Sequence, residues 1–179
     1  MERKRKMSIM VRLLLMVISP CLLLGIAMTL YSGWNMQRGM QKTTLDGMRA
    51  TDYAVLEMFK NIADGDFKQD AKGNVYRGEY KISDNNELAD YIKNKTDVDV
   101  TFFYGDTRVL TSLKDKKTGD RLIGTTASKE VTDKVLKNGK EYSDTGIVIN
   151  ERPYYGYYVP VKNSDDSIIG ICLLYTSDA

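Results

Sequence analysis

The residue of this sequence best suited to bind a small anion is Arg108. It follows the turn signal Gly105-Asp106 on a predicted strand that otherwise holds Val, Leu and Thr. A guanidinium that faces a pocket can hold a carboxylate through two parallel hydrogen bonds. An arginine beside a turn can equally be an exposed strand residue. Strand alternation places Val109 and Thr111 on the face opposite Arg108, and the pattern does not decide which face lines a pocket.

The densest aromatic cluster surrounds Gly156, with Tyr154 and Tyr155 before it and Tyr157 and Tyr158 after it. Alternation places Tyr155 and Tyr157 on one face and the other pair on the opposite face. Two rings on an inner face can wall a pocket and donate hydroxyl hydrogen bonds, and Gly156 leaves room for close approach. The alternative is that the rings only pack in the core.

The candidate ligand-binding set combines polar and aromatic positions of the predicted strands: Tyr104, Arg108, Thr111, Tyr142, Tyr155 and Tyr157. No catalytic residue, metal site or cofactor is expected. The chain has no histidine, which removes Ser-His and Cys-His nucleophile activation and the usual zinc sites. Charges nearly balance, with 26 basic and 24 acidic residues, so nucleic acid is not an expected partner.

Helix and strand signals follow one another after residue 65. They predict a strand over 75–82 and a helix over 88–95 that begins with the capping-box spacing of Asp84-Asn85-Asn86-Glu87. A β-hairpin is predicted over 98–104 and 108–113, a helix over 126–137, and strands over 142–149, 154–161 and 168–171. This order indicates an α+β fold with one antiparallel sheet.

A long helix is predicted over residues 34–64. Apolar residues recur there at helical intervals, and no proline interrupts them: Met36, Met40, Met48, Val55, Phe59 and Ile62. Part of such a stripe can pack on its own domain, and part can face a second copy of the chain.

The chain begins with a basic flank, residues 1–12, and an apolar run, residues 13–33. The run is about long enough to cross a ~30 Å hydrocarbon core. The basic flank favours a cytoplasmic N-terminus, while Tyr31 and Trp34 suit the opposite interface. A cleaved secretory signal is the alternative, but the run is long for one and lacks a small-residue cleavage site. We expect a retained transmembrane helix and an extracytoplasmic domain over 34–171, with its sheet region over 65–171.

The last eight residues, 172–179, are predicted to be non-native. They interrupt a strand in mid-course and resemble the translation of a transposon adapter used in sequencing libraries. The native chain would then continue beyond Ile171 in another sequence. A disulfide is not expected, because Cys172 falls in this tail and Cys21 lies in the predicted membrane segment.

Several segments resemble the single Cache sensor domains of bacterial chemoreceptors. They are Phe103–Val109, Gly124–Ala127, Lys137–Tyr142 and Tyr154–Val161, and their order and spacing match from about residue 34 to 171. The resemblance implies a transmembrane helix that continues into a long helix, packed on a PAS-like antiparallel sheet whose loops enclose a small-ligand pocket. It also implies a homodimer, and a second membrane helix, a HAMP linker and a cytoplasmic signalling coiled coil, which are missing from this fragment.

The predicted function is therefore a non-catalytic, membrane-anchored extracytoplasmic sensor of a methyl-accepting chemotaxis receptor. Arg108 suits an organic acid or amino acid carboxylate as the ligand, and a neutral ligand among tyrosines is the alternative. The sensor of a histidine kinase or a diguanylate cyclase is a second hypothesis. An anchored hydrolase is a third, disfavoured by the lack of histidine and of nucleophile-elbow or P-loop spacing.

Overall fold

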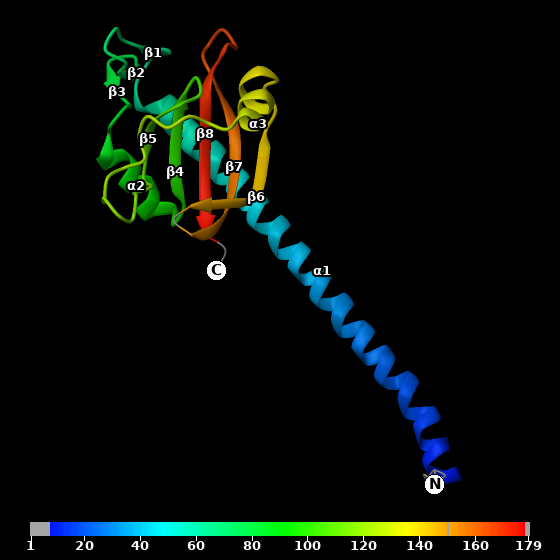
Figure 1. The fold of residues 1–179 in the computed structure, drawn as a ribbon. Helices are drawn as coiled ribbons and strands as arrows, with labels where there is room; N and C mark the ends of the chain where they lie inside the picture. The colour runs from blue at the N-terminus through cyan, green and yellow to red at the C-terminus, as the bar shows by residue number, and fades with distance from the viewer. Residues whose placement is uncertain (1–7, 150, 178–179) are drawn as a thin grey trace. The chain divides into compact units, whose positions relative to one another are not determined.

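The structure is a computed structural model that describes residues 8–149 and 151–177. The chain forms two compact units, Met1–Thr43 and Thr44–Ala179. Helix α1 (Ile9–Ile62) contributes to both units (Figure 1). The predicted long helix thus ends within two residues of its expected C-terminal limit.

The first unit consists of the N-terminal part of α1. The most apolar 18-residue stretch of that helix has a mean hydropathy of 2.5 and no buried residue, so its length and composition are sufficient to cross a membrane. Pro20 lies inside the helix. Of the predicted cytoplasmic flank, residues 1–7 lie outside the described residues.

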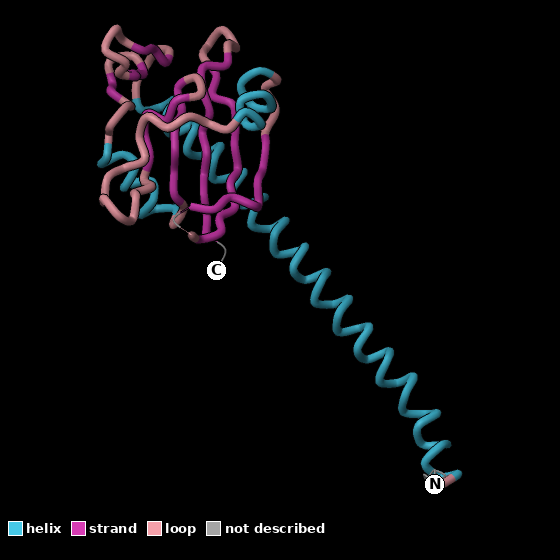
Figure 2. Tube along the Cα trace, in the orientation of Figure 1, coloured by secondary structure: helices cyan, strands magenta, loops and turns pink. Residues whose placement is uncertain are grey.

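The second unit is built on a five-stranded antiparallel sheet of order β5-β4-β8-β7-β6 (Figures 1 and 2). Its strands are β4 (Asp99–Tyr104), β5 (Thr107–Thr111), β6 (Tyr142–Ile149), β7 (Arg152–Lys162) and β8 (Ile168–Ser177). The prediction of an α+β fold with a long helix and an antiparallel sheet is confirmed.

A second, three-stranded sheet was not predicted. It contains β1 (Phe67–Gln69), β2 (Val75–Arg77) and β3 (Tyr80–Lys81). The single strand predicted over 75–82 is wrong, because the chain turns back at Gly78, whose φ is +55°. A Cβ at that position would lie 2.0 Å from the carbonyl oxygen of Asp64, so the close turn requires glycine.

The two remaining helices lie on either side of the β4–β5 hairpin in the sequence. Helix α2 (Asn86–Thr96) is capped by Asn85, which accepts from the backbone N of Leu88 at 3.1 Å. The cap therefore lies one residue after Asp84, the first residue of the predicted capping box. The helix predicted over 126–137 begins only at α3 (Lys129–Val131) and continues as the π-helix η1 (Thr132–Lys137).

The last turns of α1 pack on one face of the five-stranded sheet. Val55, Leu56 and Phe59 join one hydrophobic cluster with residues of β4 and β8. The ring of Phe59 meets that of Phe102 edge to face, with 5.3 Å between centroids. This confirms that part of the predicted apolar stripe packs on its own domain.

Candidate functional site

Strand pairing divides the sheet into two faces with different covers. The helix-side face carries Phe102 and Leu174 and packs on α1. The loop-side face carries Phe103, Ile171 and Leu173, and packs on residues from the segment that follows β5 and from α3 and η1. Figure 2 shows that segment as a loop that crosses the strands before it reaches α3.

Arg108 lies on the loop-side face, because a β-bulge interrupts the β4–β5 pairing. Phe102 pairs with Leu110, but Phe103 pairs with Arg108, which leaves Val109 as an extra residue in β5. Thr111, paired with Thr101, consequently shares the face of Arg108. The prediction from simple alternation that Thr111 opposes Arg108 is wrong for this reason, whereas Val109 does belong to the helix-side cluster.

The guanidinium of Arg108 is half-buried and only loosely held. Its Nη1 donates to the carbonyl oxygen of Leu122 at 3.3 Å, its Nη2 donates to the Tyr175 hydroxyl at 3.2 Å, and its Cζ lies 5.3 Å from the centroid of the Phe103 ring. Its Nε is buried without a hydrogen-bond partner, and no carboxylate among the described residues pairs with it. Among the described residues this cation therefore lacks a counter-charge, and its Nε lacks an acceptor.

Aromatic rings extend the loop-side face beyond Arg108. Tyr142 and Tyr158 stack with 5.6 Å between centroids, and the Lys134 ammonium lies 3.8 Å from the Tyr142 ring centroid. Burial raises the pKa of both tyrosine hydroxyls, more strongly for Tyr158, which is 7% exposed. Tyr158 was not among the candidate residues, although alternation had placed it opposite Tyr157.

The other predicted tyrosines lie on the helix-side face. Tyr104, Tyr155 and Tyr157 are partly buried against the cluster that includes α1. Thr111 lies on the face of Arg108 but is fully buried, and its hydroxyl forms a hydrogen bond with the hydroxyl of Thr101, with 2.7 Å between the oxygens. The structure therefore brings only part of the candidate set toward Arg108.

Glu141, which sequence reasoning missed, joins three elements. It accepts hydrogen bonds from Arg49 Nε at 2.8 Å and from the hydroxyls of Tyr53 at 2.6 Å and Tyr157 at 2.5 Å. The hydrogen bonds from Arg49 are the main cause that lowers the pKa of Glu141 from its usual 4.5 to about 2. Glu141 directly precedes Tyr142, the first residue of β6. Its hydrogen bonds therefore tie the start of β6 to α1.

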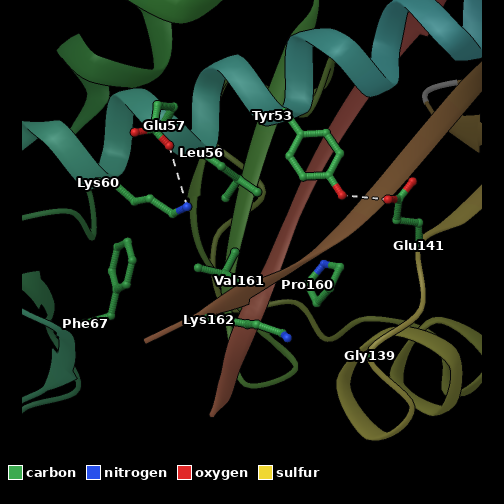
Figure 3. A pocket seen from close by; sticks show the side chains of 10 residues that line it. All are labelled: Tyr53, Leu56, Glu57, Lys60, Phe67, Gly139, Glu141, Pro160, Val161 and Lys162. Atoms are coloured by element: carbon green, nitrogen blue, oxygen red, sulfur yellow. Dashed lines mark hydrogen bonds and ion pairs between the residues drawn. The ribbon is translucent and has the colours of Figure 1, made fainter. Parts of the chain in front are cut away.

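A cavity of about 310 Å³ lies next to Glu141 on the helix-side face. Figure 3 shows its lining, which comes from α1, β1, β7 and the segment 139–141: Tyr53, Leu56, Glu57, Lys60, Phe67, Gly139, Glu141, Pro160, Val161 and Lys162. Its volume falls at the lower end of the range of small-molecule sites.

A buried acid, Asp52, also lies on the stripe of α1 that faces the sheet. It is fully buried, and neither carboxylate oxygen has a hydrogen-bond partner among the described residues. Burial raises its pKa well above the usual value, an effect that the nearby Cys172 thiol only partly offsets. The neutral acid is therefore favoured in this core.

Residues 80–177 match the family described as Single cache domain 3. The chain belongs to this family. The matched range runs from β3 through β8 and contains the whole five-stranded sheet. Cache domains are extracytoplasmic, sensory, ligand-binding domains rather than catalytic ones. The resemblance to single Cache domains drawn from the sequence is confirmed.

Solved structures similar to this Cache chain share little sequence with it. The ligand-binding domain of the Campylobacter jejuni chemoreceptor Tlp3, in complex with L-valine, is 12% identical with a TM-score of 0.44. That alignment covers 78% of this chain and 53% of the Tlp3 chain. This chain therefore spans about half of the length of the Tlp3 chain. A sensory box sensor histidine kinase from Vibrio cholerae is 13% identical with a TM-score of 0.32, over 52% of this chain and 91% of that one. A search of curated proteins found no match.

Proposed function

We propose that this Cache domain senses a small organic acid or amino acid whose carboxylate binds Arg108 on the loop-side face. The observation that supports this site is the half-buried guanidinium, whose Nε has no hydrogen-bond partner and which pairs with no acid among the described residues. A carboxylate would supply the missing negative charge and acceptors. Tyr142 and Tyr158 would form an aromatic wall beside it.

Ligand binding would be passed on through Glu141. Tyr142 belongs to the proposed site, and the adjacent Glu141 accepts hydrogen bonds from Arg49 and Tyr53 of α1. A ligand that draws the segment 137–142 toward Arg108 would favour one arrangement of this segment against α1. The ligand can shift that balance only by its different affinity for the two arrangements.

The whole protein would act as a membrane-anchored receptor with this domain outside the cytoplasm. The apolar part of α1 supports the anchor. Met36 and Met40, which are exposed on α1, would face a second copy in a homodimer. A chemotaxis receptor is the leading role, and a histidine kinase or diguanylate cyclase is the alternative. Reading the native gene beyond residue 171 distinguishes them.

Substitution of Arg108 tests the binding site. Organic acids and amino acids would be titrated into the chain in nanodiscs, with binding followed by calorimetry. Arg108→Ala should weaken the binding of an identified carboxylate ligand at least about tenfold, because a charge-assisted, paired hydrogen bond is lost. Arg152→Ala, which removes an exposed arginine from β7, should leave the affinity unchanged. Equal affinities of the wild-type chain and Arg108→Ala would refute the proposed site.

A further inference from the structure

The cavity beside α1 has the chemistry of a binding site of its own. It lies on the helix-side face, whereas Arg108 lies on the loop-side face. We propose that it binds a second small organic carboxylate, with the apolar part on Leu56, Phe67 and Val161 and the carboxylate held by Lys60 and Lys162. This inference is independent of the ligand proposed for Arg108.

The floor of the cavity is apolar and already formed. Leu56 is 7% exposed, and Phe67 and Val161 are each 2% exposed, although all of them line the cavity. Pro160 adds a rigid ring on the β7 side, as Figure 3 shows. An apolar floor is typical of small-molecule sites, in which a small number of polar groups fix the orientation of the ligand.

Lys60 and Lys162 line the cavity, and each forms only one long ion pair with an acid among the described residues. Lys60 Nζ is 3.6 Å from Glu57 Oε2, and Lys162 Nζ is 3.5 Å from Asp166 Oδ1. The lysine side chains are 55% and 47% exposed. Exposed ion pairs of this length contribute little, so both ammonium groups can turn to a ligand carboxylate at small cost.

The acid within the cavity does not oppose an anion strongly. Glu141 lies at one end, but its charge is compensated by the two-pronged contact from Arg49, with Nε and Nη2 at 2.8 and 3.1 Å. The Tyr53 and Tyr157 hydroxyls occupy further acceptor positions of the same carboxylate. The two lysines are then offset only by their long, exposed ion pairs with Glu57 and Asp166, at 3.6 and 3.5 Å.

A neighbouring hollow of about 400 Å³ increases the positive charge at the same place. It shares Lys60 and Lys162 with the cavity and adds Arg77. Arg77 Nε donates to the carbonyl oxygens of Lys60 and Ala63 at 3.2 and 3.1 Å, and no acid among the described residues pairs with its guanidinium. The acid of this hollow, Asp66, already accepts from the backbone N and hydroxyl of Ser164, both at 3.0 Å.

An occupant of this site would contact α1 directly. Leu56 and Lys60 belong to the helix, while Val161 and Lys162 belong to β7. A carboxylate bridging the two lysines would draw α1 and β7 together. The site would thus modulate the helix that the proposed sensor uses for its output, without contact with the Arg108 ligand.

Lysine footprinting on the full chain in nanodiscs tests this site with phenylacetate as the probe. Acetylation rates would be measured residue by residue by mass spectrometry. Phenylacetate should slow acetylation of Lys60 and Lys162 and leave the exposed Lys72 and Lys129 unchanged. The neutral 2-phenylethanol and inorganic phosphate should protect neither pair, because each lacks one half of the required chemistry. Uniform protection, no protection, or equal protection by either control would overturn the proposal.

Two variants separate this site from the Arg108 site. Lys162→Gln should raise the phenylacetate concentration that half-protects Lys60 about tenfold, the effect of losing one charge-assisted hydrogen bond. Arg108→Ala should leave that concentration unchanged. If Arg108→Ala instead removed the protection of Lys60, the probe would be acting from the loop-side face and the second site would be refuted. An unchanged half-protecting concentration in Lys162→Gln would also refute it.

Discussion

At the scale of single residues, Glu141 stabilises the contact between α1 and the sheet. Glu141→Gln removes the negative charge of the carboxylate to which Arg49, Tyr53 and Tyr157 donate hydrogen bonds. This change should lower the free energy of unfolding by about 2 kcal/mol. Urea denaturation followed by circular dichroism measures the change. Glu79→Gln, which alters an exposed acid, should have no effect within error.

The same variant has a defined pH signature. Because the pKa of Glu141 falls from 4.5 to about 2 on folding, its stabilising contribution is complete above pH 4.5 and is lost as the pH falls toward 2. The difference in stability between the wild-type chain and Glu141→Gln should therefore shrink over this window. A difference that stayed constant from pH 6 to pH 3 would contradict the hydrogen bonds assigned to Glu141.

Local sequence made Arg108 a candidate but not Glu141, and the reason is physical. Arg108 is unusual among the apolar neighbours of its own strand, which is a local signal. Glu141 is one of 24 acidic residues in the chain and lies in a polar segment. Its partners come from α1 and β7, so only tertiary packing reveals it. Alternation correctly separated Tyr157 from Tyr158, but it could not show which face carried Arg108.

At the scale of elements, the sequence predicted most of the regular helices and strands, but not the bulge and the tight turn that interrupt strands. β6 has the predicted bounds, β4, β5 and β7 differ from the predicted strands by one or two residues at their ends, and β8 runs six residues beyond its predicted end at 171. The bulge at Val109 and the turn at Gly78 were missed, because each depends on a pairing partner or a close contact that is distant in sequence. That single bulge moves Thr111 to the face of Arg108.

Gly170 tests how closely the central strands pair. A Cβ there would lie 2.0 Å from the carbonyl oxygen of Phe103, a backbone atom that cannot rotate away. Gly170→Ala should therefore destabilise the domain by about 2 kcal/mol or more. Gly47→Ala is the matched control: it has open space around its Cβ on α1 and should stabilise by about 1 kcal/mol through helix propensity. Equal effects in urea denaturation would contradict the β4–β8 register.

At the scale of the whole molecule, the sequence was sufficient for the family and the fold class. The apolar run follows from composition, and the long helix and the order of the strands along the chain follow from periodicity. The family match over 80–177 covers the five-stranded sheet. The predicted non-native tail 172–179 and the orientation in the membrane remain predictions. Residues 172–177 extend β8 in the sheet, while 178–179 lie outside the described residues.

The orientation can be measured with single cysteines in intact cells. In a chain with Cys21→Ala and Cys172→Ala, Lys68→Cys would report on the Cache domain and Ser8→Cys on the basic end of α1; both positions are exposed. A membrane-impermeant maleimide should label position 68 directly and position 8 only after permeabilisation, because positive charge near the start of a span favours the cytoplasm. Both proteins should keep the full mass of the chain. Labelling of position 8 in intact cells, or loss of the N-terminal segment, would contradict a receptor whose sensor is tethered outside the cytoplasm by α1.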